Sequence, residues 1–161
     1  MERFRRLLAL FPASERRAPE LARGFARALA SRGDRLPGCR PTLARLRARY
    51  RLGVVTNGID HVQHARLRAA GLTSLFEVVV TSEGCGFAKP DPRILGVALG
   101  ALGVAPPRAL FVGDDVAVDG AAARAAGMPF CWLDRGDPLP AGHRRPRRRV
   151  HNLLELSRRL E

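Results

Sequence analysis

Short runs of apolar, largely β-branched residues recur along the chain and alternate with stretches whose apolar residues follow helical spacing. The run "LGVVT" stops at Asn57 and Gly58, and "FEVVVTS" ends in hydroxyl residues. "ALFVGDD" ends in two aspartates and "MPFCWLD" in one. Apolar runs of this length, without strict alternation, are typical of strands that are buried on both faces. The pattern predicts four parallel strands, near residues 51–56, 77–81, 109–113 and 129–133.

The stretches between and around these runs predict helices. Leu21, Phe25 and Leu29 recur every four residues within residues 18–33, and a second helix is expected from Pro41 onward. The remaining helices are expected over residues 60–71, 92–103, 117–127 and 151–161. Strands that alternate with helices predict an α/β fold, with a Rossmann-like parallel sheet covered by helices on both faces.

Composition fits a globular, cytoplasmic protein. The 161 residues are 46% hydrophobic and 27% charged, which suits one domain with a hydrophobic core. The apolar runs are too short to span a membrane, and the basic start of the chain lacks a signal-peptide cleavage pattern. Cys39, Cys85 and Cys131 are odd in number and show no metal-site spacing, which favours a reducing compartment.

The net charge of +13 raises the question of a nucleic-acid partner. The excess lies at the two ends of the chain, with +9 in residues 1–50 and +5 in residues 138–161, whereas residues 51–137 carry −1. The one dense basic cluster, residues 143–149, has no aromatic neighbours in the sequence, unlike surfaces that bind single strands. We interpret it as a solvated basic loop, and keep nucleic-acid binding as a remote alternative.

Polar residues follow the ends of the predicted strands. Ligands of parallel sheets bind outside the carboxyl ends of the strands, so these residues are expected to gather at one rim. Thr56, with the backbone of Asn57 and Gly58 near a helix N-terminus, has the hydrogen-bond donors that a phosphoryl group needs. Lys89, in the loop after the second strand, adds a compact positive charge, and it is the only lysine in the chain.

Acidic residues follow the third strand. Carboxylate oxygens, with water completing the shell, are the ligands that Mg²⁺ prefers, so Asp114 with Asp115 or Asp119 forms a candidate metal site. Together with the lysine and the threonine they predict a metal-assisted phosphoryl-transfer site. Structural interpretations stay open: Asp115 as a cap of the next helix, Asp119 as a surface acid, and residues 56–58 as a simple turn.

Three of these segments, in this order, resemble the motifs of the haloacid dehalogenase superfamily of phosphohydrolases. "TNG" is similar to its second motif, "GFAKPDPRIL" to its third, and "FVGDDVAVDGAAARAAGM" to its fourth. The resemblance covers about residues 36–135 and points to the branch with phosphoglycolate phosphatases, sugar-phosphate phosphatases and pyrimidine nucleotidases. It implies a small phosphorylated metabolite as substrate. It also implies that Thr56 binds the phosphoryl group, that Lys89 steadies nucleophile and phosphate, and that Asp114, Asp115 and Asp119 hold Mg²⁺. It also implies a partial helical cap in residues 1–35 and an α/β core in residues 36–161.

The first motif of that superfamily, Asp-x-Asp after a central first strand, is absent from the chain. The resemblance implies that its first aspartate is the nucleophile, so we expect the chain as given to be inactive on phosphate esters. We also expect two unpaired strand edges at the centre of the sheet. A start assigned too late in a longer reading frame and a real truncation both stay open.

Two other classes of protein share part of this pattern. A response-regulator receiver domain also combines acids, a hydroxyl residue and a lysine, but its acid pair follows the first strand and its lysine the last, the opposite of the order here. A non-catalytic binding or regulatory module of the same fold is the stronger alternative, because the nucleophile is absent. The substrate and the oligomeric state stay undetermined at this level.

Overall fold

The computed structural model describes residues 17–160; residues 1–16, which belong to the predicted cap, and residue 161 lie outside the described part. The four predicted strands are present as β1 (Gly53–Thr56), β2 (Val78–Thr81), β3 (Phe111–Gly113) and β4 (Phe130–Leu133), and a short β5 (Arg149–Val150) follows. The helices are α2 (Ala18–Ala30), α3 (Cys39–Arg47), α4 (Asp60–Ala69), α5 (Ser82–Cys85), α6 (Arg93–Leu102), α7 (Ala121–Ala125) and α8 (Leu153–Leu160). A π-helical turn, Val116–Gly120, leads into α7.

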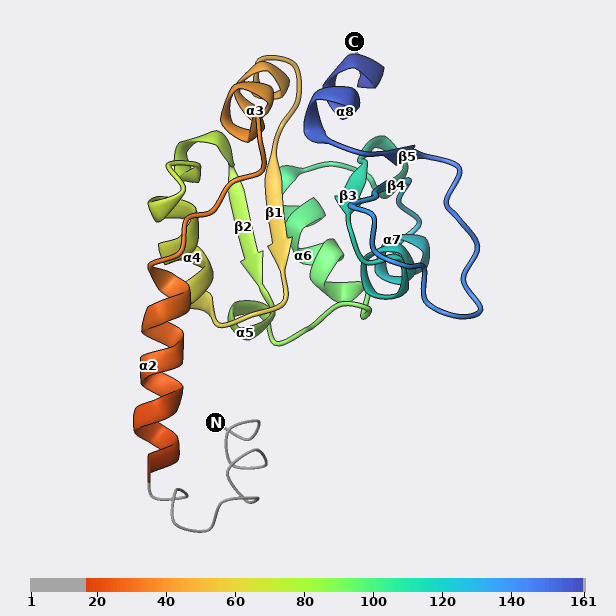
Figure 1. Cartoon of the computed structure of the whole chain (residues 1–161). Helices are drawn as coiled ribbons and strands as arrows, with labels where there is room; N and C mark the ends of the chain where they lie inside the picture. The colour runs from red at the N-terminus through yellow and green to blue at the C-terminus, as the bar shows by residue number, and fades with distance from the viewer. Residues whose placement is uncertain (1–16, 161) are drawn as a thin grey trace.

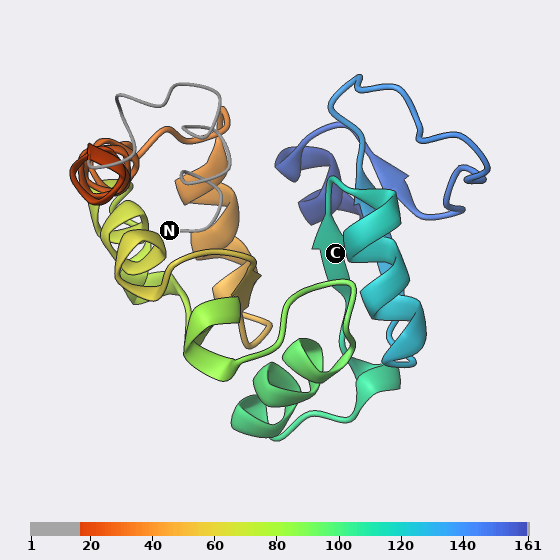
Figure 2. The ribbon, with the colours of Figure 1, turned by 90° about the horizontal axis from the view of Figure 1, so that it is seen from below.

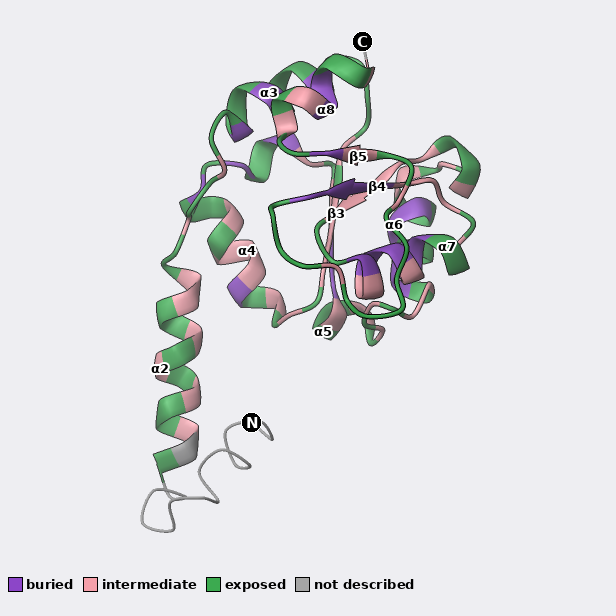
Figure 3. Ribbon diagram, turned by 45° about the vertical axis from the view of Figure 1, so that its right-hand side comes forward, coloured by how far each residue is buried: buried purple, intermediate pink, exposed green. Residues whose placement is uncertain are grey.

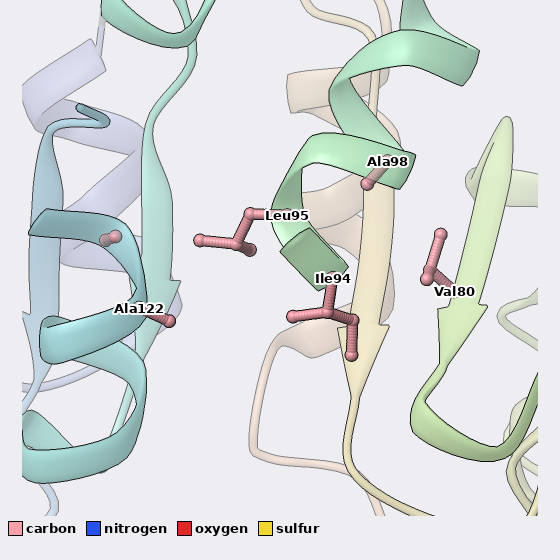
Figure 4. Close-up of a cluster of buried hydrophobic side chains, with 6 residues drawn as sticks. Val80, Ile94, Leu95, Ala98 and Ala122 are labelled. Atoms are coloured by element: carbon pink, nitrogen blue, oxygen red, sulfur yellow. The ribbon is translucent and has the colours of Figure 1, made fainter. Parts of the chain in front are cut away.

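The strands form two separate parallel sheets. β1 pairs with β2 in register from Gly53 opposite Val78 to Thr56 opposite Thr81, and β3, β4 and β5 form the second sheet in that order. β1 and β3 therefore each have one edge that pairs with no strand in the described part of the chain. β1, β2 and β3 point towards the same end of the molecule (Figure 4). This arrangement agrees with the expected parallel α/β fold and with two unpaired edges at its centre.

A core on the α6 side holds the two sheets together. Ile94 and Leu95 of α6 are 0% and 1% exposed, and they cluster with Val80 of β2 and Ala122 of α7. Figure 4 shows Leu95 pointing from α6 towards β3, while Ile94 lies beside β1. Complete burial of such a side chain stabilises a fold by about 1.5–3 kcal/mol. The sheets are thus joined through α6 and its neighbours, because no ladder of hydrogen bonds joins them.

A second core covers the opposite face, where α3 and α8 lie (Figure 2). Leu46 of α3 and Leu156 of α8 pack with Leu133 of β4 and Val150 of β5, all of them buried. Helices therefore cover both faces of the sheets, as the alternation of apolar runs and helical stretches predicts.

Arg149 corrects one prediction, that residues 143–149 form a solvated loop. Its side chain lies over the ring of Trp132 at 5.4 Å, and its Nε is 2.6 Å from a carboxylate oxygen of the buried Asp134. Burial of that carboxylate requires a partner, and the arginine that closes the basic cluster supplies it. The pKa of Asp134 lies below its usual value because the Gly136 N–H donates to it, with a further contribution from the Arg149 charge. The other arginines of the cluster are exposed, as expected.

α2 extends from the body of the molecule and packs along α4 (Figures 1 and 3). It begins with a proline in its first turn, and it exposes Leu21 and Phe25 on the apolar stripe that the spacing predicts. Among the described residues, no helix combines the length and the apolar character that crossing a membrane requires.

Candidate phosphoryl-binding site

Lys89 lies between the two sheets at the carboxyl ends of their strands. Its Nζ is 2.8 Å from Asp119 Oδ1 and donates to the Val55 carbonyl of β1 at 3.2 Å. The same nitrogen lies 5.4 Å from the centre of the Phe111 ring of β3. The side chains of Lys89 and Asp119 are only 11% and 8% exposed. The one lysine of the chain is therefore a largely buried, paired cation that contacts both sheets, which is a setting unlike that of a surface lysine.

Asp119 is fixed from two sides, so the interpretation as a surface acid is wrong. The residue is 5% exposed, and its second oxygen accepts a hydrogen bond from the Asp115 N–H at 3.3 Å. The carboxylate lies directly over Gly113, where an added Cβ would be 2.6 Å from Asp119 Cγ. The glycine of "GDD" is therefore needed for the close approach of this carboxylate to the end of β3.

The two aspartates after β3 have different surroundings. One oxygen of Asp115 accepts from the N–H groups of Ala117 and Val118, both at 2.9 Å, so this residue caps the following turn, as its structural interpretation holds. The Asp114 side chain is 51% exposed and has a loose contact, 3.4 Å, with Arg135. Asp114 and Asp115 are both exposed, but only Asp114 has no role in the helix cap.

A magnesium ion fits this arrangement only in part. The described residues contain no cluster of three or more His, Cys, Asp or Glu side chains that could hold a metal. Asp119 is engaged by Lys89, and one oxygen of Asp115 by the helix cap. A cation held mainly by Asp114 would keep most of its shell as water, which Mg²⁺ tolerates but which gives weak binding.

Of the four residues expected to bind the substrate, which are Thr56, Asn57, Gly58 and Lys89, Thr56 is the least engaged. Its hydroxyl has no hydrogen bond to any described residue, and it ends β1 one position after the carbonyl that Lys89 contacts. The Gly58 N–H donates to Ser82 Oγ at 2.9 Å, and the Asn57 side chain bonds to the backbone of Lys89. Thr56 is therefore the donor best placed to reach a ligand.

Sequence reasoning missed a buried link between β2 and α4. The Thr81 hydroxyl, on a residue that is 1% exposed, donates to Asp60 Oδ1 at 2.7 Å, and Asp60 N–H donates to Glu83 at 2.8 Å. These bonds hold the start of α4, which follows residues 56–58 in the chain, against the end of β2. An acid in the first helical turn and a threonine ending a strand were the visible signals, but their pairing depends on the register of β1 against β2.

A hollow of about 300 Å³ lies beside the aspartate pair, beneath residues 135–140. Asp114, Trp132, Arg135 and Asp137 contribute to its wall, and the Trp132 indole N–H donates to the Asp114 carbonyl at 3.0 Å. The exposed carboxylate of Asp114 therefore borders a space at the low end of the size range for small-molecule sites.

The curated proteins that this chain is similar to include a phosphatase and a nucleotidase. The chain is 38% identical over 154 residues to a phosphoserine phosphatase of Thermus thermophilus, covering 95% of this chain and 61% of that protein. It is 35% identical over 116 residues to the pyrimidine 5'-nucleotidase YjjG of Escherichia coli, covering 71% and 52%. The chain thus spans little more than half the length of these curated relatives.

A solved structure of the HAD-hydrolase YfnB from Bacillus subtilis, described as bound to magnesium, superposes with a TM-score of 0.82 at 26% identity, covering 89% of this chain and 63% of that one. Residues 4–127 match the model of the haloacid dehalogenase-like hydrolases. That match includes β1, β2 and β3, Lys89 and the aspartates after β3, and β4 follows directly after it. Because the match covers most of the chain, the chain belongs to the haloacid dehalogenase-like hydrolase family.

Proposed function

We propose that this chain provides the phosphate-binding and magnesium-binding parts of a phosphatase that acts on a small phosphorylated metabolite. The observation that carries the proposal is the ammonium of Lys89, held between Asp119 and the Val55 carbonyl. Thr56, whose hydroxyl bonds no described residue, is the next residue of β1 after Val55. A fixed cation next to a hydrogen-bond donor is what a phosphoryl group requires, and neither has to reorganise when the ligand arrives. Because an ammonium is compact, it fits in a space that a wide guanidinium fork could not enter.

In this proposal Thr56 donates to a phosphoryl oxygen and Lys89 neutralises its charge. Asp114 would hold Mg²⁺ on the side of the hollow, where the ion would polarise the phosphoryl group. The curated relatives are named for phosphoserine and for pyrimidine nucleotides, which share a phosphate monoester on a small polar body. We propose that chemical class as the ligand of this chain.

Hydrolysis needs a further group. Covalent phosphoryl transfer requires a carboxylate in line with the leaving oxygen, and no Asp-x-Asp motif occurs in the 161 residues. Asp119, the carboxylate beside Lys89, is neutralised by it and buried, so it is a poor nucleophile. We therefore propose that these residues bind a phosphate ester without turning it over.

The test compares two proteins with para-nitrophenyl phosphate and Mg²⁺. One is residues 1–161, and the other adds a strand that ends in Asp-x-Asp, taken from the coding sequence upstream of Met1 or, without such a strand there, from the Thermus relative. The proposal expects turnover only in the longer protein and its loss in Lys89→Ala. Turnover by residues 1–161 that disappears in Lys89→Ala would contradict the statement about the nucleophile. Silence of the longer protein, with its fold intact, would favour a non-catalytic binding module.

A further inference from the structure

The side chain of Asn57 forms a two-point contact with the backbone of Lys89. Its Oδ1 accepts from the Lys89 N–H at 2.8 Å, and its Nδ2 donates to the Lys89 carbonyl at 2.9 Å. The carboxamide thus pairs with one residue's backbone in the way that neighbouring strands pair, although Asn57 and Lys89 are 32 residues apart. Two good bonds to one residue constrain both its distance and its orientation.

This contact determines where the Lys89 side chain starts. The ammonium lies 3.2 Å from the carbonyl of Val55, which is two residues before Asn57 on the same strand end. Both ends of the lysine are therefore held at the end of β1. Asn57 bonds its backbone, and the Val55 carbonyl bonds its ammonium. With the backbone fixed, the side chain is left to span the space from the loop to Asp119.

We propose that Asn57 is a positioning residue, which places the Lys89 ammonium for the phosphoryl group through its two bonds to the Lys89 backbone. The inference rests on the proposed function, because it assigns Asn57 a part in that site. Both polar atoms of its carboxamide bond the Lys89 backbone, so the orientation of the side chain is set by the lysine. This differs from the expectation that Asn57 contributes directly to substrate binding.

Other bonds hold the rest of the loop, so the effect of Asn57 is separable from folding. The Gly58 N–H donates to Ser82 at 2.9 Å, and the Glu83 N–H donates to the Gly58 carbonyl at 3.3 Å. Asn57 itself is exposed, and its replacement opens no cavity in either core. Loss of its side chain should release the Lys89 backbone while β1 and α4 keep their places.

The experiment uses the fact that Lys89 is the only lysine. In protein grown with lysine labelled with ¹³C at Cε, a proton–carbon NMR spectrum shows the Hε protons of Lys89 alone, so no further assignment is needed. In the wild type the ordered side chain should give two resolved Hε protons. In Asn57→Ala and in Asn57→Asp these should merge, as they do in a mobile lysine. Asn57→Asp keeps the shape and removes the Nδ2 donor, so it tests the contact even if the alanine variant folds poorly.

Inorganic phosphate supplies the second readout. Titration of the wild type should move the lysine signal, and both variants should bind phosphate about tenfold more weakly, as the loss of one or two hydrogen bonds allows. Asn152→Ala is the matched control. The exposed carboxamide of Asn152 also accepts a hydrogen bond from a backbone N–H, that of Glu155 at 2.8 Å, but it lies at the start of α8 and away from the site. It should leave the lysine signal and the phosphate affinity unchanged.

Unchanged Hε protons in both folded Asn57 variants would overturn the inference, whatever phosphate does. A wild-type lysine signal that does not respond to phosphate would contradict the proposed function, while the phosphate-free spectra would still decide the role of Asn57. Merged Hε protons in the variants together with weaker phosphate binding would support both.

Discussion

Replacement of Gly113 by alanine should disrupt the site although it adds only one methyl group. The new Cβ would lie 2.6 Å from Asp119 Cγ and 2.7 Å from Asp119 Cβ, so the buried carboxylate has to move. Its movement separates it from Lys89, whose ammonium is now 2.8 Å away. Overpacking costs about 1–3 kcal/mol, and loss of one partner of a buried ion pair about 3–5 kcal/mol. The two costs do not add in full, because the shift of Asp119 that relieves the overpacking also breaks the ion pair and an 11% exposed lysine can turn partly to water; we expect about 3 kcal/mol.

The assay is unfolding by urea and by heat, followed by the fluorescence of Trp132, the only tryptophan, which is 4% exposed. A loss of about 3 kcal/mol corresponds to a fall of about 6–12 °C in melting temperature for a chain of this size. Gly96→Ala is the matched control, because a Cβ there, in the helix α6, meets nothing within 4 Å. That variant should gain up to about 1 kcal/mol from helix propensity. A Gly113→Ala protein as stable as the wild type would refute the close packing of Asp119 against β3.

Three further outcomes are expected. A thiol reagent at pH 8 should modify Cys85 first, because burial raises the pKa of the other two cysteines; equally fast reaction of all three thiols in the native state would contradict this. Isothermal titration should show weak Mg²⁺ binding that is lost in Asp114→Asn, and equal binding by both proteins would sink that ligand assignment. Because the Gly136 N–H lowers the pKa of Asp134, its ionised form stabilises the fold above about pH 4, the pKa of an unfolded aspartate, and this contribution is lost as the pH falls through the lower folded value. Acid-unfolding curves should therefore be shallower for Asp134→Asn, and curves that superpose on the wild type would argue against it.

Sequence pattern predicted the regular part of the fold, because burial on both faces leaves a direct trace in residue type. The strands β1 to β4 fall within the four apolar runs, and the longer helices fall within the predicted stretches, except that α3 begins at Cys39, two residues before the predicted start. β5 was not predicted, because Arg149 follows a basic run and only tertiary contacts with Asp134 and Trp132 draw it into the sheet. Its pairing is therefore invisible to local pattern.

The candidate site was predictable in its residue types but less so in their contacts. Strand ends in a parallel sheet meet at one rim, which correctly brought Lys89 and Asp119 together. The same argument could not tell that Asn57 pairs with the lysine backbone, or that Gly58 bonds Ser82, because these contacts depend on loop geometry that has no period. Asp119 was open to interpretation as a surface acid, since only the absence of a side chain at Gly113 allows its burial.

The most direct test of the account replaces the single lysine by the residue that the chain uses everywhere else for positive charge. The affinity of inorganic phosphate, measured by isothermal titration calorimetry with Mg²⁺ present, should fall at least about tenfold in Lys89→Arg, because the planar guanidinium cannot occupy the space of the compact ammonium. Urea unfolding of the variant would show that it is folded under the conditions of the titration. Equal phosphate affinity in the wild type and in folded Lys89→Arg would contradict the claim that this ammonium is the centre of a phosphoryl-binding site.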